Sequence, residues 1–118
     1  MEMIKELKLA LECLSEHKAE DIAVLDVSQK TPFATFYVLT TCINERALDS
    51  TANILADDFR KGGFTVDAVD GKPETGWIVV KANEVVVHLF TDKQRKTIDL
   101  DTLFLEAKKI KVPTKKSK

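Results

Sequence analysis

Three carboxylates are the side chains that could hold a metal ion. Asp26 closes a short apolar run, and Asp67 and Asp70 belong to a later one. Carboxylate oxygens are the ligands that Mg²⁺ prefers, so one interpretation is a small magnesium-dependent nucleotidyltransferase or hydrolase. However, Asp67 and Asp70 stand an odd number of residues apart on a strand and should face opposite ways. The sequence favours solvated turn carboxylates over a metal site.

The histidines and cysteines do not form a recognisable catalytic pattern. His17 lies at a polar helix end and His88 in a strand, and neither stands beside a Cys or Ser at a strained turn. Cys13 and Cys42 lack the spacing of a metal or redox motif, which indicates buried, reduced thiols. Neither a Gly-rich phosphate loop nor a nucleophile elbow is present. We therefore expect no catalytic residue, metal or cofactor.

The chain's only Trp and one of its two His residues fall in the stretch "GWIVVKANEVVVHLF", which predicts two strands and a tight turn. A two-residue turn at Ala82–Asn83 or Asn83–Glu84 would sort the strand residues onto two faces. The aliphatic face holds Ile78, Val80, Val85, Val87 and Leu89. The mixed face holds Trp77, Val79, Val86, His88 and Phe90.

The mixed face of this hairpin has two interpretations. Aromatic, aliphatic and titratable groups together are typical of the centre of a protein–protein contact, where Trp and Tyr anchor the interface. Alternatively, a helix covers this face too, and His88 is a hydrogen-bonded core histidine. Periodicity alone leaves both open.

The remaining segments position this hairpin within a mixed α/β (α+β) fold. We predict helices over 3–18, 45–61 and 91–109, and strands over 21–27, 33–42 and 64–71 besides the hairpin, 76–90. Gly62 and Gly63 suit the end of the second helix. The order is αββαβββα: a five-stranded mixed sheet flanked by helices, with a right-handed βαβ crossover through the helix 45–61.

Composition predicts one domain, residues 1–107, followed by a basic flexible tail, 108–118. The chain has 118 residues and a net charge of −1, but its last eleven residues carry six Lys and no acid. The rest carries 12 basic against 19 acidic residues, a net charge of −7. An acidic body suits a basic protein partner rather than nucleic acid, although the tail could touch RNA weakly.

The sequence carries no sign of export or of a membrane span. It has no secretory apolar segment, and no apolar run approaches the ~20 residues that a membrane-spanning helix needs. The N-terminal segment is acidic and helical, unlike an Arg- and Ser-rich transit peptide. A cytoplasmic location is expected.

Three stretches together resemble the ribosomal silencing factor family (Iojap, or RsfS). They are "EDIAVLDVSQKTPFATFYVLTTCINERALDSTAN", "VDGKPETGWIVVKANEVVVHLF" and "RKTIDLDTLF", and they span about Glu20 to Phe104. The family pattern places a Trp before a strand, a short acidic turn, a Val-Val-Val-His-aromatic strand, an Arg and an aromatic ending. Here Ile98 replaces its usual Tyr, Phe104 its Trp, Asn83 a Gly, and Thr35 an Asp.

The resemblance implies a fold similar to nucleotidyltransferases without their catalytic carboxylates, and so no enzyme activity. It implies binding to large-subunit ribosomal protein fourteen at the intersubunit face, which blocks subunit joining and represses translation when nutrients are scarce. It also implies homodimers off the ribosome. The expected partner-binding residues are Trp77, Val79, His88, Phe90, Arg95, Ile98 and Asp99. The alternatives are the magnesium enzyme and a homodimeric scaffold whose Trp face is the self-interface.

Overall fold

A six-stranded mixed sheet forms the centre of the part of the chain described by this computed structural model, which comprises residues 4–17, 19–29, 31–32, 34–98 and 108–110. The helices are α1 (Lys5–Glu16), α2 (Glu45–Lys61) and α3 (Asp92–Ile98), with one 3₁₀ turn, η1 (Pro73–Thr75). The strands are β1 (Glu20–Asp26), β2 (Phe36–Cys42), β3 (Val66–Asp70), β4 (Trp77–Ala82), β5 (Val85–Thr91) and β6 (Lys108–Ile110). The predicted mixed α/β class and the order αββαβββα are confirmed up to α3. None of the described helices combines the length and apolarity that crossing a membrane requires.

The strands lie in the order β3-β4-β5-β2-β1-β6, and only β2 and β5 are parallel neighbours. The β1–β2, β3–β4, β4–β5 and β1–β6 pairs are antiparallel. Because β3 and β2 therefore run in the same direction, α2 is a crossover, as predicted. It carries the chain from the middle of the sheet past β5 and β4 to the edge strand β3.

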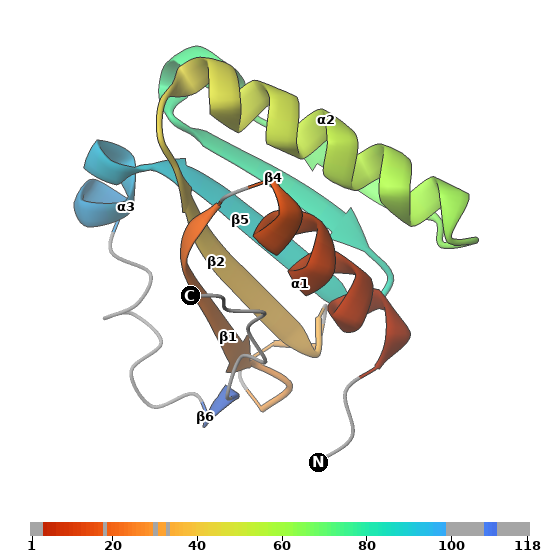
Figure 1. Ribbon diagram of the computed structural model, residues 1–118. Coiled ribbons are helices and arrows are strands. Elements are labelled where there is room, and N and C mark those ends of the chain that lie inside the picture. The colour runs from red at the N-terminus through yellow and green to blue at the C-terminus, as the bar shows by residue number, and fades with distance from the viewer. Residues whose placement is uncertain (1–3, 18, 30, 33, 99–107, 111–118) are drawn as a thin grey trace.

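The helices α1 and α2 cover one face of the sheet (Figure 1). Their apolar stripes pack on the inward residues of the strands, which include the aliphatic face of the hairpin β4–β5. The buried helix positions include Leu7, Leu11 and Leu14 in α1 and Leu48, Ala52, Leu55 and Phe59 in α2. Each recurs at three- or four-residue spacing along its helix, which is why periodicity predicted both helices.

The ends of α2 are built from residues suited to capping. The Asn44 side chain accepts a hydrogen bond from the Ala47 N–H at 2.8 Å, which satisfies one of the free donors of the first turn. After the last turn Gly63 adopts φ +88°, a left-handed conformation that glycine tolerates without a Cβ penalty. The predicted glycine stop is confirmed, although Gly62 itself stays at negative φ.

The other face of the sheet carries a second apolar cluster, with Leu25, Val27, Leu39, Val86 and Phe90 at its centre. Ile98 packs against this cluster, so α3 lies on the face opposite α1 and α2. The two faces of the sheet are therefore covered by helices that leave neighbouring strands. Helix α2 follows β2, and α3 follows β5.

The last part of the chain differs from the prediction. The expected helix over 91–109 begins at Asp92 and is described to Ile98, while Lys108–Ile110 form β6 rather than helix or tail. This short strand pairs antiparallel with β1, with Ile110 opposite Val24. Without it β1 would present an open edge of unpaired backbone groups. Residues 99–107 lie outside the described part of the chain.

Candidate docking surface

The turn between β4 and β5 sets which side chains share a face. It has two residues, Asn83 and Glu84, and pairs Trp77 with Phe90 and Val79 with His88. Asn83 adopts φ +54°, which Asn tolerates better than most residues, and its backbone N–H donates to Asp67 at 2.9 Å. The predicted sorting of the hairpin into an aliphatic and a mixed face is therefore confirmed.

Four rings meet on the mixed face, and we call Tyr37, Trp77, His88 and Phe90 the ring cluster. Trp77 stacks on Phe90 with centroids 5.4 Å apart, and the His88 ring lies 5.9 Å from Trp77 and 4.6 Å from Tyr37. Tyr37 is a member that the sequence analysis missed. It comes from β2, which pairs with β5 in parallel, and only that pairing places it beside His88.

Not all of the hairpin residues expected to bind a partner reach the surface. Phe90 is 1% exposed and His88 7%, because the indole stacks over Phe90 and the second apolar cluster closes around both. Trp77, Val79 and Tyr37 remain partly exposed. The alternative of a core histidine therefore holds for His88. The residues that can meet a partner directly are Trp77, Val79 and Tyr37.

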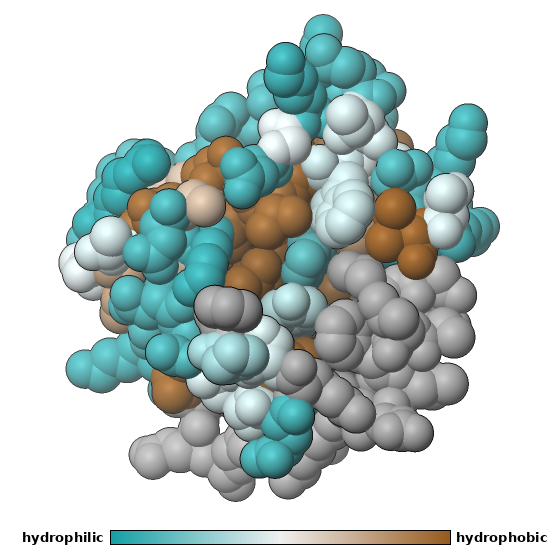
Figure 2. Space-filling model, turned by 180° about the vertical axis from the view of Figure 1, so that it is seen from behind, coloured by the Kyte–Doolittle hydropathy of each residue, from teal (hydrophilic) through white to brown (hydrophobic). Residues whose placement is uncertain are grey.

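Apolar and weakly polar side chains gather on this side of the molecule, and hydrophilic ones border them where the described residues form the edge (Figure 2). The view is from behind Figure 1, so it looks onto the face away from α1 and α2. A mixed apolar patch with a polar border has the anatomy of a protein-contact site.

His88 holds the indole in place. The Trp77 Nε1–H donates to His88 Nδ1 at 3.3 Å, so Nδ1 must be the unprotonated nitrogen. Burial lowers the pKa of His88 to about 4, and the ring is neutral at neutral pH. Its Nε2 then carries the proton, is buried and has no hydrogen-bond partner among the described residues. Leaving the Nε2–H donor buried and unpaired costs about 1–3 kcal/mol of stability. This is the cost of burying the ring so that its Nδ1 can accept from Trp77.

Arg95 binds this chain's own strands. Its Nη1 donates to the Asp21 backbone carbonyl and, at 3.1 Å, to the Thr41 hydroxyl. Asp21 adopts φ +51° within an irregularity of β1, so the guanidinium satisfies a carbonyl that the strand ladder leaves free. Arg95 was expected at the partner-binding surface, and whether it meets a partner stays a prediction. Within the chain, it ties α3 to the β1–β2 pair.

The other two expected partner residues lie beside Arg95 in sequence. Ile98 is partly buried against the second apolar cluster, where an aliphatic side chain fits in place of the family's Tyr. Asp99 lies outside the described residues. Of the two partner-binding residues expected after Arg95, the structure therefore describes only Ile98.

The three candidate carboxylates do not come together. Asp67 lies 3.8 Å from the Lys81 ammonium and accepts the Asn83 N–H, while Asp26 accepts the Ser28 N–H and hydroxyl. β3 and β1 are four strand spacings apart, about 19 Å, which no single ion can bridge. Within the described ranges, no three His, Cys, Asp or Glu residues are placed to bind a metal.

The two thiols are buried and unreactive by environment. Burial raises the pKa of Cys13 to about 12 and also raises the pKa of Cys42. A thiol is nucleophilic only as its thiolate, so neither side chain is activated at neutral pH.

The chain matches known proteins along its whole length. The family model described as "Ribosomal silencing factor during starvation" matches residues 1–118. Ribosomal silencing factor RsfS of Chromobacterium violaceum is 29% identical over 104 residues, covering 88% of this chain and 85% of that protein. RsfS of Bacillus subtilis is 27% identical over 101 residues, covering 86% of each.

A plant protein and two solved structures extend these matches. Protein Iojap, chloroplastic, of Zea mays is 30% identical over 99 residues, covering 84% of this chain and 43% of that protein. A crystal structure of a Chromobacterium violaceum protein superposes with a TM-score of 0.83 at 27% identity, covering 100% of this chain and 98% of that one. A Bacillus halodurans structure shares the fold, with a TM-score of 0.78 at 21% identity over 89% of this chain and 95% of that one.

Proposed function

The chain belongs to the ribosomal silencing factor family, and from that premise we propose that it represses translation by binding the large ribosomal subunit. In this proposal the partly exposed part of the mixed face docks on large-subunit ribosomal protein fourteen. The bound protein then occupies space that the small subunit needs, so subunits cannot join when nutrients are scarce. The proposed role is steric, takes place in the cytoplasm and requires no chemistry from the chain.

The observation that carries this proposal is an indole that is partly exposed yet fixed in position. Trp77 is stacked on Phe90 and hydrogen-bonded to His88, so little side-chain entropy is lost when a partner covers it. Tyr37 and Val79 lie on the same face. Aromatic anchors of this kind supply most of the binding energy in protein interfaces.

The charge of the chain supports a basic partner. Residues 1–107 carry a net charge of −7, and ribosomal proteins that contact RNA are generally basic. The Lys-rich end, residues 108–118, has the opposite sign and would contribute weak, salt-dependent contacts to ribosomal RNA.

Replacing the anchor tests the proposal. Trp77→Ala removes the indole and should weaken co-sedimentation with purified large subunits by about 30- to 1000-fold, the equivalent of roughly 2–4 kcal/mol. Trp77→Phe is the matched variant, because it keeps an aromatic ring over Phe90 but loses the N–H donated to His88 and part of the contact area of the indole. Its affinity should lie between those of the parent and the alanine variant.

Two measurements complete this test. Unfolding by urea must show that Trp77→Ala is folded under the binding conditions. Light scattering of mixed subunits then reports joining: the parent should inhibit it and Trp77→Ala should not. A folded Trp77→Ala variant that binds large subunits as tightly as the parent shows that the docking surface lies elsewhere.

We also propose a homodimer off the ribosome, formed through the same face. One patch cannot bind a second copy and the ribosome at once, so the two states should compete. In equilibrium sedimentation, added large subunits should convert the dimer into subunit-bound monomer. A dimer that persists on the subunit would place the self-interface on another face.

A further inference from the structure

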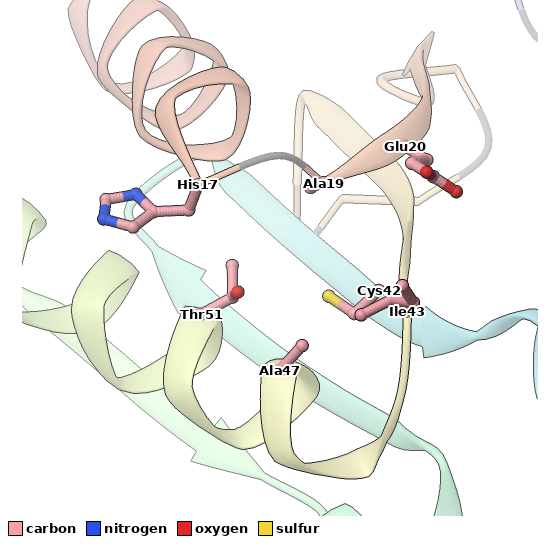
Figure 3. A pocket seen from close by; sticks show the side chains of 7 residues that line it. All are labelled: His17, Ala19, Glu20, Cys42, Ile43, Ala47 and Thr51. Atoms are coloured by element: carbon pink, nitrogen blue, oxygen red, sulfur yellow. The ribbon is translucent and has the colours of Figure 1, made fainter.

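A hollow of about 340 Å³ lies at the carboxyl end of β2, between the end of α1 and the start of α2 (Figure 3). Cys42, Ala47 and Thr51 form its inner wall, and their side chains point into the same space. Its outer lining comes from His17, Ala19, Glu20 and Ile43. The volume is at the low end of the range for binding cavities, about 300–1,000 Å³.

The hollow lies at the carboxyl end of β2, on the side of β1, and so beside rather than within the crevice between β2 and β5. β2 and β5 are parallel neighbours, and the chain leaves β2 into α2 on one face and β5 into α3 on the other. Neighbouring strands whose connections leave to opposite faces form a topological switch point, and ligands bind outside the carboxyl ends of such strands.

The inner wall is suited to an uncharged, apolar group. The Cys42 thiol is 2% exposed, and the Thr51 side chain beside it is also buried. Burial raises the pKa of Cys42 and keeps it neutral. Ala47 adds a methyl group. An incoming aliphatic side chain would therefore displace no charged group from the inner wall.

Ile43 extends this apolar wall into solvent. It is 80% exposed, whereas the other large exposed hydrophobic side chain in the described residues, Val69, is 44% exposed and lies on the edge strand β3. A single exposed aliphatic residue needs no explanation. An isoleucine beside an apolar hollow offers two surfaces that one incoming group can bury together.

The charges around the hollow are mainly negative. Residues 16–22 and 42–49 hold five carboxylates against Lys18 and Arg46, a net charge of −3. All five carboxylate residues, Glu16, Glu20, Asp21, Glu45 and Asp49, are exposed. The acidic body of a second copy, residues 1–107, would be repelled here, whereas a lysine- or arginine-rich segment would be attracted.

The hollow adjoins the proposed docking surface. Arg95 on α3 contacts Asp21 and Thr41, and the next residues in each strand, Glu20 and Cys42, line the hollow. One partner lying against α3 can therefore reach around the end of the sheet to the hollow.

We infer that the hollow receives an aliphatic side chain from a lysine- or arginine-rich segment of the same basic protein partner that covers Trp77. The inference rests on the proposed function and adds a second contact to it. The aliphatic side chain packs against Ile43, Ala47 and Cys42. The flanking cationic groups lie near Glu20 and the other exposed carboxylates.

Two serine variants test the apolar contact in the full-length protein. Ile43→Ser should weaken binding to purified large subunits by about 10-fold, because it removes one apolar side of the contact. Val69→Ser is the matched control, an exposed aliphatic residue on the far edge of the sheet, and should bind as the parent does. Both side chains are exposed, so urea unfolding midpoints should stay near that of the parent.

A charge variant tests the basic segment. Glu20→Gln should weaken binding and reduce the slope of log affinity against log salt concentration, because one ion pair is lost. Glu74→Gln, on the exposed turn η1, should change neither quantity. An unchanged slope in Glu20→Gln would overturn the basic character of the segment.

The outcomes separate this inference from the proposed function. If Ile43→Ser binds like Val69→Ser while Trp77→Ala loses binding, the hollow is unused and the proposed function stands. If Trp77→Ala binds as tightly as the parent but Ile43→Ser does not, the hollow contacts the large subunit and the mixed face around Trp77 is not the docking surface. If Ile43→Ser changes only the self-association of the free protein, the hollow is filled by a second copy of the chain. The inference that a basic partner segment fills it is then wrong.

Discussion

At the scale of single residues, His88 links the stability of the fold to the geometry of the docking surface. Its Nδ1 accepts the Trp77 indole N–H, and this requires the neutral ring. Burial keeps the ring neutral by lowering its pKa to about 4. The acceptor beneath Trp77 is therefore present throughout the neutral range and is lost only in acid.

This residue should make the protein less stable as the pH falls. The unfolded state binds a proton at His88 near the ordinary pKa of 6.5, whereas the folded state does so near 4. The stabilising effect of the neutral ring is therefore complete above pH 6.5 and is lost progressively down to about pH 4. The expected loss in the free energy of unfolding is about 3 kcal/mol, measured by urea denaturation at pH 7 and pH 4.

His88→Asn is the variant that isolates this effect. Asparagine does not titrate, and its side-chain oxygen can still accept from the indole. The carboxylates contribute the same pH dependence to both proteins, so the parent should lose about 3 kcal/mol more than the variant. Equal losses in parent and variant would show that His88 is not the group responsible.

At the scale of elements, Arg95 is the contact that fixes α3 to the sheet. The described part of the helix has seven residues, and a segment of that length is held in place by tertiary contacts. Two hydrogen bonds from one charged guanidinium reach strands β1 and β2. The position of α3 beside the docking surface therefore depends on Arg95 and on the packing of Ile98.

Arg95→Ala should loosen α3 without unfolding the domain. Amide hydrogen exchange over residues 92–98 should become faster, with a loss of about 1–3 kcal/mol of local stability, since the Asp21 carbonyl loses a charged donor. Lys93→Ala, an exposed position on the same helix, is the control and should leave exchange unchanged. Unchanged exchange in Arg95→Ala would mean that apolar packing alone holds the helix.

Local patterns predicted most of these elements. The helical spacing of Leu48, Leu55 and Phe59 and the alternation through "WIVVKA" depend only on neighbours in sequence, and both were predicted correctly. The strand at 108–110 was not predicted, because a lysine-rich segment becomes a strand only when the β1 edge is available. Tyr37 was missed for a similar reason: it joins His88 through the pairing of strands far apart in sequence.

The sequence predicted which face of the hairpin each residue lies on, but not how exposed each residue is. Parity along the hairpin correctly placed Trp77, Val79, His88 and Phe90 on one face. Whether a ring protrudes depends on which neighbour lies over it, and Trp77 lies over Phe90. Packing between strands determines which ring is covered, and the sequence of a single strand does not reveal it.

At the scale of the whole molecule, the sheet order separates the candidate carboxylates, and residues 1–107 carry an excess of negative charge. Asp26 and Asp67 lie in strands four positions apart in the sheet, so these two carboxylates cannot share an ion. The excess of negative charge over residues 1–107 gives a broad field. Such a field attracts a basic partner over distances of about one Debye length, ~8–10 Å.

The rate of association with large subunits should therefore depend on salt. Raising the ionic strength from about 50 to about 200 mM should slow association severalfold and change dissociation little, because steering acts before contact. Biosensor kinetics with immobilised large subunits would measure both rates. Trp77→Ala should show the opposite pattern, with faster dissociation and the same salt response. An association rate that does not respond to salt would contradict electrostatic steering.

The indole of Trp77 is the chain's single tryptophan, and it lies partly open to water on the face proposed to dock. All of the tryptophan emission of this protein therefore originates at that face. A partner that seals the indole from water shifts this emission to shorter wavelength, so the molecule carries an optical reporter of its own occupancy and needs no attached dye.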